Sequence, residues 1–153
     1  MKLSHLDEAG RARMVDVGDK PLLDRTAVAA GTIRMTREAF RQVADQAIAK
    51  GDVLAVSEVA GTLAAKRTAE LIPLCHPLGL DHVAVDASLD ETLPGVRVRA
   101  AVRTVGRTGV EMEALTAVSI ALLTVYDMVK AADPAMVIEE VRLVEKKKVP
   151  VDA

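Results

Sequence analysis

A short loop in the sequence places a cysteine and a histidine side by side between two prolines. Pro73 and Pro77 restrict the backbone around Cys75 and His76, and rigid loops on a scaffold often carry functional groups. Cys75 could act as a nucleophile or a metal ligand, but adjacent side chains rarely point at one target. His76 is therefore the stronger candidate, as a hydrogen-bond donor or a proton-transfer group near neutral pH. The alternative is a loop histidine with no role.

The charged residues of one long helix form a second candidate group. Asp127 and Lys130 are three residues apart, so they are neighbours on the helix surface and form either a structural ion pair or part of a site. Glu113 lies fourteen residues before Asp127, which corresponds to about 21 Å along the helix axis. A small substrate does not reach both residues from one chain. If both belong to one site, we expect two subunits to build it.

The start of this helix is predicted by Thr108 and Glu111, which have the spacing of a capping box. Glu111 could equally contact a ligand, because the N-terminus of a helix is suited to binding anions. Both roles are compatible, since a capping side chain also lies at that end of the helix.

Apolar residues of the long helix form two stripes. A surface helix of a monomer needs only one apolar stripe, so the second stripe predicts a subunit interface with charged groups emerging at both ends. The first stripe, expected to face the sheet, is Leu115, Val118, Leu122, Val125 and Val129. The second is Glu113, Thr116, Ile120, Leu123, Asp127 and Lys130. The preceding helix has one stripe, expected to face inward: Val53, Val56, Ala60, Leu63, Ala64 and Arg67.

A polyphosphate would need several cations, and the sequence offers Arg25, Lys50, Lys66 and Arg67 in addition to Lys130. Arg25 precedes a predicted strand, Lys50 ends a predicted helix, and Lys66 lies late in the next one. Each of them alone is more commonly a solvated surface charge. Because the formal net charge is −2, an anion site must be such a local cluster and not a general positive field.

Hydrophobic periodicity predicts the elements that position these residues. Their order, β-α-α-β-β-α-β, becomes the ferredoxin-like β-α-β-β-α-β order if the helix pair acts as one crossover. We expect one α+β domain over residues 1–153, with an antiparallel sheet, helices on one face, an irregular N-terminal arm at 1–25 and a tail at 146–153. The predicted strands are 26–35, 81–90, 95–105 and 137–144. The predicted helices are 36–50, 52–71 and 108–132, with Thr36 as N-cap and Gly51 as C′ residue of the first.

The composition disfavours several classes of function. With one Phe, one Tyr and no Trp, the chain lacks an aromatic platform for stacking bases, so we expect no nucleic-acid partner. The apolar stretch 114–129 includes Thr, Ser and Asp, which favours a buried helix over a membrane span. The single cysteine fits a reducing compartment, and residues 1–10 lack the apolar segment of a secretory signal. We therefore expect a cytoplasmic protein.

Taken together, these motifs resemble those of the molybdenum cofactor biosynthesis protein C family, the cyclic pyranopterin monophosphate synthases. The matching segments run in order over nearly the whole chain, and the longer ones are highly specific. They are Met14-Val-Asp-Val17, Lys50-Gly-Asp52, Ala65-Lys-Arg-Thr68, Leu71-Ile-Pro-Leu-Cys-His-Pro77, Thr108-Gly-Val-Glu-Met-Glu-Ala-Leu-Thr116, Tyr126-Asp-Met128 with Lys130, and Met136-Val-Ile138.

The resemblance implies that (8S)-3',8-cyclo-7,8-dihydroguanosine 5'-triphosphate is converted to cyclic pyranopterin monophosphate with release of pyrophosphate. It also implies a homo-oligomer, a hexamer built as a trimer of dimers with sites at the dimer interface. The sequence requires no cofactor and predicts no metal site, although Mg²⁺ could accompany the triphosphate. The catalytic residues carried over are Asp127, Lys50, Lys130 and His76. The substrate-binding residues carried over are Leu74, Cys75, His76, Met112, Glu113, Glu111, Arg25 and Lys66.

Two other readings of the residues stay open. A ferredoxin-like fold also permits a non-catalytic ligand-binding or regulatory module, because a fold alone does not determine function. A zinc enzyme would require Cys75 or His76 to meet ligands from distant parts of the chain, since the spacing of the histidines and the one cysteine is not that of a zinc site.

Overall fold

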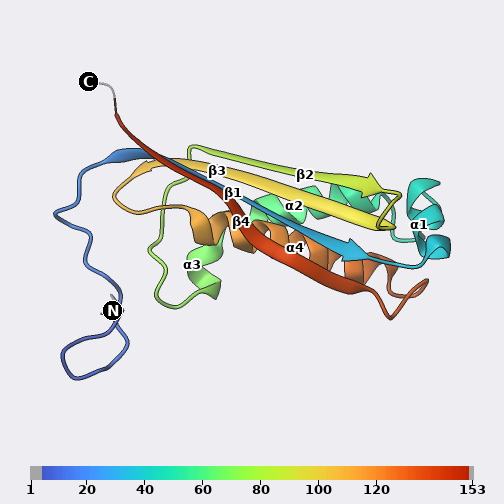
Figure 1. The fold of residues 1–153 in the computed structure, drawn as a ribbon, viewed down its shortest axis with the longest axis horizontal. Helices are drawn as coiled ribbons and strands as arrows, with labels where there is room; N and C mark the ends of the chain where they lie inside the picture. Colours follow the sequence, from blue (N-terminus) through green and yellow to red (C-terminus); the bar gives the residue numbers. More distant parts are fainter. Residues whose placement is uncertain (1–4, 152–153) are drawn as a thin grey trace.

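The computed structural model describes residues 5–151, which contain four strands and four helices (Figure 1). The strands are β1 (Leu23–Arg34), β2 (His82–Asp90), β3 (Gly95–Gly106) and β4 (Val137–Pro150). The helices are α1 (Arg37–Ala44), α2 (Val53–Lys66), α3 (Thr68–Leu71) and α4 (Glu111–Val129). The strands form one antiparallel sheet in the order β2-β3-β1-β4, which confirms the α+β, ferredoxin-like prediction.

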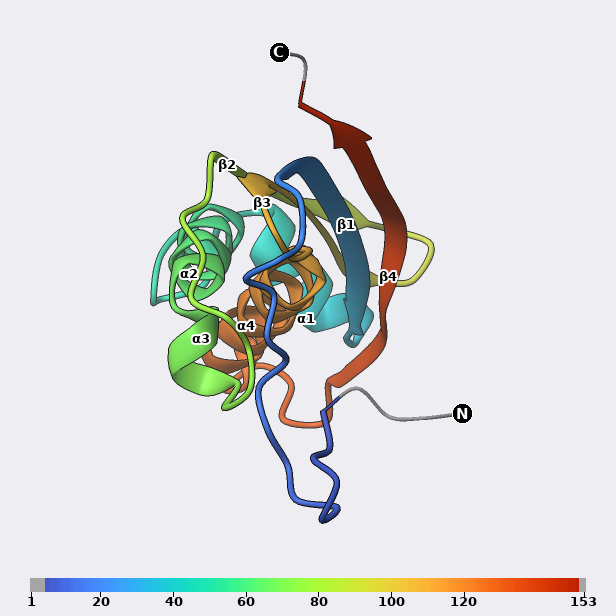
Figure 2. The same cartoon turned by 90° about the vertical axis from the view of Figure 1, so that its left-hand side faces the viewer.

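Helices α2 and α4 pack on the same side of the sheet (Figure 2). The side chains of β3 that were predicted to face inward are at most 1% exposed, as the period of two requires: Val96, Val98, Ala100 and Val102. The sheet-facing stripe of α4 is confirmed as well. Leu115 is partly buried at its edge, and the others have no exposed surface: Val118, Leu122, Val125 and Val129. Helix α4 is long and apolar enough to cross a membrane by composition, but this packing makes it a core helix.

A glycine sets the contact between α2 and α4. A Cβ atom at Gly61 would lie 2.9 Å from the carbonyl oxygen of Ala117 and 3.3 Å from the Cβ of Ala121, both in α4. Only glycine permits such a close approach without displacing the backbone. The contact fixes α4 beside the helix that begins just after Lys50.

The inner face predicted for α2 is only partly correct: Val53 and Ala64 are buried, but Val56, Leu63 and Arg67 are not. The buried residues of this helix are mostly small: Val53, Ser57, Gly61, Ala64 and Ala65. Ser57 tolerates burial because its hydroxyl donates to the Leu54 carbonyl oxygen at 2.7 Å. Val56 and Leu63 are instead 44% and 48% exposed, and Arg67 is exposed at the point where α2 ends and α3 begins.

The first helix is shorter than the predicted span 36–50. Thr36 is its N-cap as expected, accepting a hydrogen bond from the backbone N–H of Ala39 at 3.3 Å. The helix stops at Ala44, however, and Gln46 adopts the left-handed backbone conformation, with φ of 54°. Gly51 therefore does not end this helix. A glutamine in this conformation carries no compositional signal, whereas a glycine does.

Strands β1 and β4 are both longer than predicted. Strand β1 begins at Leu23, inside the predicted arm, and β4 continues to Pro150 through residues assigned to the tail. Residues 146–148 pair with residues 25–27 of β1. An edge strand exposes much of its surface and so needs no alternation of apolar residues. The basic residues 146–148 therefore gave no sign in the sequence that β4 continues through them. Residues 1–4 and 152–153, the ends of the predicted arm and tail, lie outside the described residues.

The predicted capping box at the start of α4 is wrong. The N-cap is Val110, whose side chain makes no capping hydrogen bond, and Glu111 is the first residue of the helix. Glu111 forms an ion pair with Lys146 of β4. Thr108 still belongs to the loop after β3, so its spacing to Glu111 has no capping role.

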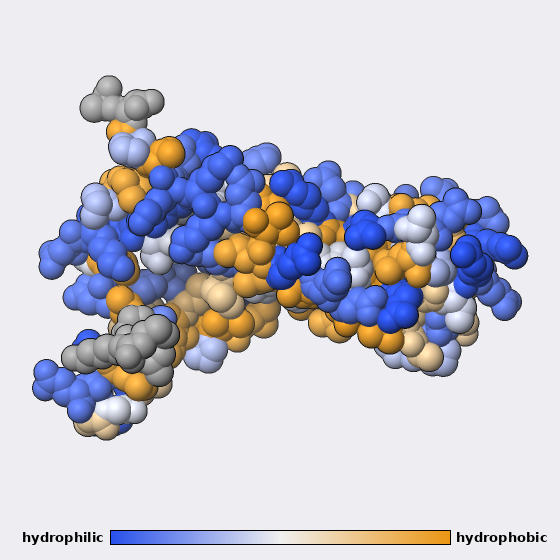
Figure 3. All heavy atoms as spheres, viewed as in Figure 1, coloured by the Kyte–Doolittle hydropathy of each residue, from blue (hydrophilic) through white to orange (hydrophobic). Residues whose placement is uncertain are grey.

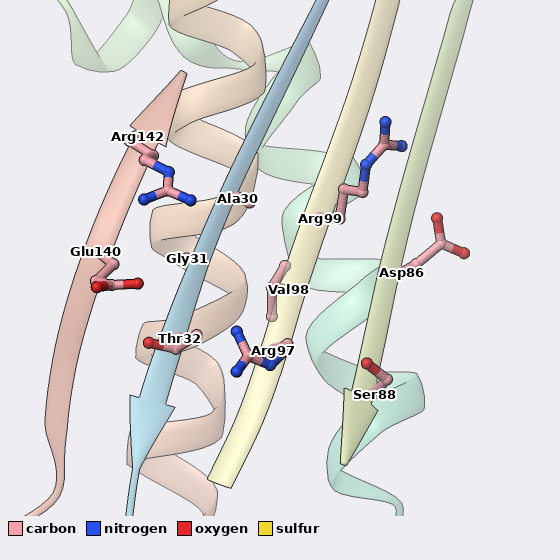
Figure 4. Close-up of a pocket in the computed structure, with 10 residues that line it drawn as sticks. All are labelled: Ala30, Gly31, Thr32, Asp86, Ser88, Arg97, Val98, Arg99, Glu140 and Arg142. Carbon is pink, nitrogen blue, oxygen red and sulfur yellow. The ribbon is translucent and has the colours of Figure 1, made fainter. Parts of the chain in front are cut away.

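The second face of the sheet carries charged side chains and, within residues 5–151, no helix lies over it (Figures 2 and 4). Arg97, Arg99 and Arg142 stand on this face around a hollow of about 340 Å³. Acidic groups balance them, since Arg97 pairs with Asp90 and Glu140 lines the same hollow. The hollow is lined by none of the predicted site residues, all of which lie elsewhere.

Candidate active site

The C-terminal end of α4 gathers three of the predicted catalytic residues. Asp127 lies in the last turn of α4, and Lys130 is the C-cap. Lys130 Nζ donates to Asp127 Oδ1 at 2.6 Å, and Lys50 Nζ donates to Asp127 Oδ2 at 2.8 Å. Lys50 also donates to the Asp127 carbonyl oxygen at 2.9 Å, which satisfies one free acceptor at the end of the helix. One carboxylate is thus held between two ammonium groups.

These ammonium groups keep Asp127 ionised. Hydrogen bonds from Lys130, and then from Lys50, lower the pKa of Asp127 to about 2, and the bond to Asp127 raises the pKa of Lys130. All three side chains are at least half exposed, so water screens the pairs and each contributes little to stability. An anionic ligand can therefore reach both lysines and compete for their hydrogen bonds.

Five of the remaining predicted residues line a hollow of about 470 Å³ at the N-terminal end of α4: Leu74, Cys75, His76, Glu111 and Met112. The loop after α3 places the Cys75 thiol beside the first turn of α4, and both Cys75 and the adjacent His76 line this one hollow. The lining residues are His5, Ile72, Leu74, Cys75, His76, Leu78, Thr108, Gly109, Glu111 and Met112.

Glu113 is buried beside this hollow, with 3% of its surface exposed. The Cys75 thiol donates to Glu113 Oε1 at 3.6 Å, and Glu113 Oε2 has no hydrogen-bond partner among the described residues. Burial raises the pKa of Glu113. The expectation that Glu113 emerges as a charged end of an exposed stripe is therefore wrong, because the loop at Cys75 packs against this turn of α4.

Cys75 is a poor nucleophile in this environment. Burial, and then the charge of Glu113, raise the pKa of Cys75 to about 11. The group is therefore a neutral thiol at physiological pH, and it is the thiolate that attacks electrophiles or binds metals. Its contact with Glu113 indicates a role as hydrogen-bond donor.

The His76 ring lies between the large hollow and the N-terminal arm. His76 Nε2 is 2.7 Å from the carbonyl oxygen of Val15, and the ring also lines a smaller hollow formed by residues 14–18. The arm is irregular, as predicted, but it is attached to the body of the protein. Arg107 donates hydrogen bonds to the carbonyl oxygens of Gly18 and Lys20.

Arg25 and Lys66 do not line the large hollow. Arg25 donates to the carbonyl oxygens of Gly106 and Arg107 at 2.9 Å and 3.2 Å, which fixes the loop that leads into α4. Lys66 lines a separate hollow with Asp81 at the exposed end of α2. In this subunit, neither residue joins the cluster around His76.

Within one subunit, the predicted site residues thus form two separate clusters, one at each end of α4. Asp127 and Glu113 belong to one continuous helix, so about 21 Å of helix axis separates them. The predicted residues of the C-terminal cluster meet each other, as do those of the N-terminal one. Within residues 5–151, no group of three or more His, Cys, Asp or Glu side chains is arranged to hold a metal ion.

Several residues that take part in the site were not predicted from the sequence. His5, assigned to the arm without a role, lines the large hollow, and Lys146, assigned to the tail, pairs with Glu111. The Val15 carbonyl binds His76, and Arg107 holds the arm. A contact made by a backbone carbonyl cannot be recognised from residue types. The only sign of a role for Val15 in the sequence was that it belongs to one of the motifs shared with the family.

Comparison with known proteins gives concordant matches over nearly the whole chain. A family model described as the MoaC family matches residues 14–148. The cyclic pyranopterin monophosphate synthase of Roseiflexus sp. is 60% identical over 144 residues, covering 94% of this chain and 91% of the relative. The protein of the same name from Heliobacterium modesticaldum is 58% identical with the same coverage. That from Thermomicrobium roseum is 57% identical over 145 residues, covering 95% of this chain and 87% of the relative.

Proposed function

Because this chain belongs to the MoaC family, we propose that it acts as a cyclic pyranopterin monophosphate synthase, a phosphorus–oxygen lyase of molybdenum cofactor biosynthesis. It converts the cyclic dihydro-GTP derivative to cyclic pyranopterin monophosphate and pyrophosphate. The observation that carries this proposal is the Asp127 carboxylate held between Lys50 and Lys130. A base beside two cations, all open to solvent, suits a reaction in which a triphosphate loses pyrophosphate.

The cyclic phosphate forms when a hydroxyl group of the substrate attacks its α-phosphorus and the bond to pyrophosphate breaks. Negative charge then builds on the leaving group, and the ammonium groups of Lys50 and Lys130 stabilise it by donating hydrogen bonds. Asp127, ionised in the free protein, can accept the proton of the attacking hydroxyl. Rearrangement of the purine-derived ring needs further proton transfers, for which His76 is the candidate.

Substrate binding changes the environment of Asp127. The phosphates attract the same two lysines that hold this carboxylate. When Lys50 and Lys130 turn to the phosphates, the hydrogen bonds that lower the Asp127 pKa weaken and negative charge comes near. The pKa of Asp127 then rises, so its carboxylate becomes a better base only when substrate is present.

We propose that the two clusters meet across a dimer interface. An apolar face opposite the sheet includes Val56, Val59 and Leu63 of α2, which are 44–60% exposed, and Leu123 of α4, which is 52% exposed. Apolar residues gather along the lower edge of Figure 3, where Figure 1 draws α4 behind β4. A twofold axis near the middle of α4 would place the Asp127 end of one subunit against the Cys75 end of its partner. Three such dimers would form the hexamer implied by the resemblance.

The expectations from the sequence about cofactors, partners and localisation also apply to this proposed enzyme. No protein-bound cofactor is assigned, and Mg²⁺ would come with the triphosphate. The near-neutral net charge and the lone free cysteine, Cys75, support a cytoplasmic enzyme of small molecules, without a nucleic-acid or membrane partner.

The decisive experiment is incubation of the purified protein with the cyclic dihydro-GTP derivative, followed by mass analysis of the product and assay of pyrophosphate. Formation of both in equal amounts is the expected result. Tight binding of the substrate without pyrophosphate release would favour a non-catalytic binding module. Repeating the reaction with EDTA, and then with added Mg²⁺, determines whether the ion takes part.

A further inference from the structure

His76 makes one hydrogen bond that restricts its chemistry. Nε2 lies 2.7 Å from the carbonyl oxygen of Val15. A carbonyl oxygen only accepts, so Nε2 must carry a hydrogen atom. This is true of the neutral ring with its hydrogen on Nε2 and of the protonated ring, which has hydrogens on both nitrogens. While this bond persists, only Nδ1 can gain or lose a proton.

The carbonyl of Val15 is held by the way the arm is attached. Arg107, in the loop after β3, donates to the carbonyl oxygens of Gly18 and Lys20, the latter at 2.7 Å. The N–H of Gly18 in turn donates to Asp16 Oδ1 at 2.8 Å, which connects the anchored segment to the residue beside Val15. A short path of hydrogen bonds and intervening backbone therefore runs from Arg107 to the ring of His76.

The ring separates two hollows. His76 lines the hollow of about 470 Å³ on one side and, on the other, a hollow of about 360 Å³ bounded by residues 14–18 of the arm. Because the Nε2 edge faces the arm, the Nδ1 edge is the one left for a ligand. Arg107 itself does not line the large hollow, so it would act on a ligand only through the arm.

We propose that Arg107 and arm residues 15–18 position His76 so that it exchanges protons with the substrate through Nδ1, while Nε2–H stays bound to Val15. Only the identity of the substrate in this inference rests on the proposed function. In turnover, Nδ1 takes a proton from the substrate to give the imidazolium ion and later returns one to it. The ring ends in its starting form, so the cycle needs neither a ring flip nor a change of tautomer.

The first test is ¹⁵N NMR of the full-length protein with labelled imidazoles, without substrate, at a pH where the His76 ring is neutral. Loss of signals in His76→Gln assigns them. We expect a protonated Nε2 and an unprotonated Nδ1. A hydrogen on Nδ1, or an average of the two tautomers, would overturn the proposal. Because no substrate is used, this result is independent of whether the protein proves to be a synthase.

The second test separates positioning from general stability. Arg107→Ala should move the His76 nitrogen signals toward an average of tautomers and lower kcat roughly 10-fold with little change in KM, because the ring loses its orientation. Arg107→Lys should restore part of both. Arg11→Ala is the matched control, since Arg11 is 80% exposed and bonds to Asp7 within the arm. An unchanged His76 spectrum in Arg107→Ala, or the same change in Arg11→Ala, would contradict the role of Arg107.

Discussion

The two ends of α4 hold their carboxylates in opposite states. At the C-terminal end, Asp127 is exposed, accepts from two lysines and has its pKa lowered to about 2, chiefly by the hydrogen bond from Lys130. At the N-terminal end, Glu113 is buried, accepts from the Cys75 thiol at 3.6 Å and has its pKa raised by burial. One helix therefore carries a carboxylate stabilised by partners and another penalised by its surroundings.

This difference determines what each end can offer a ligand. A solvated, paired charge can exchange partners at small cost, because water screens the groups during the exchange. A buried carboxyl with an unpartnered oxygen gains from a ligand that donates a hydrogen bond to it. Under the proposed function, the phosphates suit the Asp127 end and the N–H groups of the ring system suit the Glu113 end of a partner subunit.

Removal of the C-terminal carboxylate should have the largest effect. Asp127→Ala is expected to lower turnover about 10²–10⁴-fold, the usual contribution of a general base, while keeping the fold. Lys50→Ala should act in the same direction. Pyrophosphate release measures the activity and circular dichroism the fold. Asp24→Ala is the control, because Asp24 also forms a surface ion pair, with Arg103, and bonds to neither of the lysines that hold Asp127. Full activity in Asp127→Ala or Lys50→Ala would refute the assignment.

The N-terminal cluster should protect its thiol from alkylation. With its pKa raised from 9.0 to about 11, Cys75 should react with iodoacetamide on the order of 100-fold more slowly at pH 8 than an ordinary thiol, since only the thiolate reacts. The same chain unfolded in urea provides the reference, because Cys75 is its only cysteine. Glu113→Gln removes the nearby charge and should speed the reaction. Equal rates in the folded and unfolded chains would mean that this end is not the apolar environment described.

Mixing experiments test whether the two ends belong to one site. Asp127→Ala and Glu113→Ala subunits, each inactive alone, should recover about one quarter of wild-type activity when unfolded and refolded together in equal amounts. Half of random dimers are then mixed, and each mixed dimer has one intact site. Mixing two Asp127→Ala preparations is the control. Proof of mixed dimers by mass spectrometry without any recovery would place each site within a single subunit.

The sequence predicted those parts of the fold in which side-chain period follows burial. The alternation in β3 and the first stripe of α4 were correct because a sheet and a helix meet there face to face. Prediction failed where backbone conformation, small buried residues or polar edge pairing determines the structure. Gln46 takes a left-handed conformation, Gly61 and Ser57 occupy the inner face of α2, and β4 continues through residues 146–150 as a polar edge strand.

The candidate site residues could be predicted from motifs, but their burial and their hydrogen-bond partners could not. Asp127 and Lys130 were expected to be neighbours from their spacing, and they are. The burial of Glu113 depends on how the Cys75 loop packs on α4, and the environment of His76 depends on a carbonyl from the arm. Both are contacts between segments distant in sequence, which residue types alone do not report.

The smallest expected effect concerns stability, and it contrasts the two carboxyls directly. The pKa of Glu113 is raised in the folded state, so the folded protein binds this proton more tightly than the unfolded chain does. The associated stability is fully present below the unfolded pKa of about 4.5 and is lost as the pH rises through the raised, folded value. Above that pH range the wild-type protein no longer has this stabilisation, because ionising Glu113 in its buried position is costly.

Glu113→Gln removes this ionisation while preserving an acceptor for Cys75. The variant should be more stable than the wild type at pH 7, and the difference should shrink toward pH 4, as measured by urea unfolding at constant protein concentration. The pKa of Asp127 is lowered instead, so Asp127→Asn should show the reverse sign: it loses stability at pH 7 and approaches the wild type only as the pH falls toward about 2. Because Asp127 and its two lysines are exposed to water, that loss of stability is expected to be small. Glu91→Gln, in the exposed turn between β2 and β3, is the control. Variants at both ends shifting in the same direction with pH would mean that the two carboxyls do not differ in the way their surroundings require.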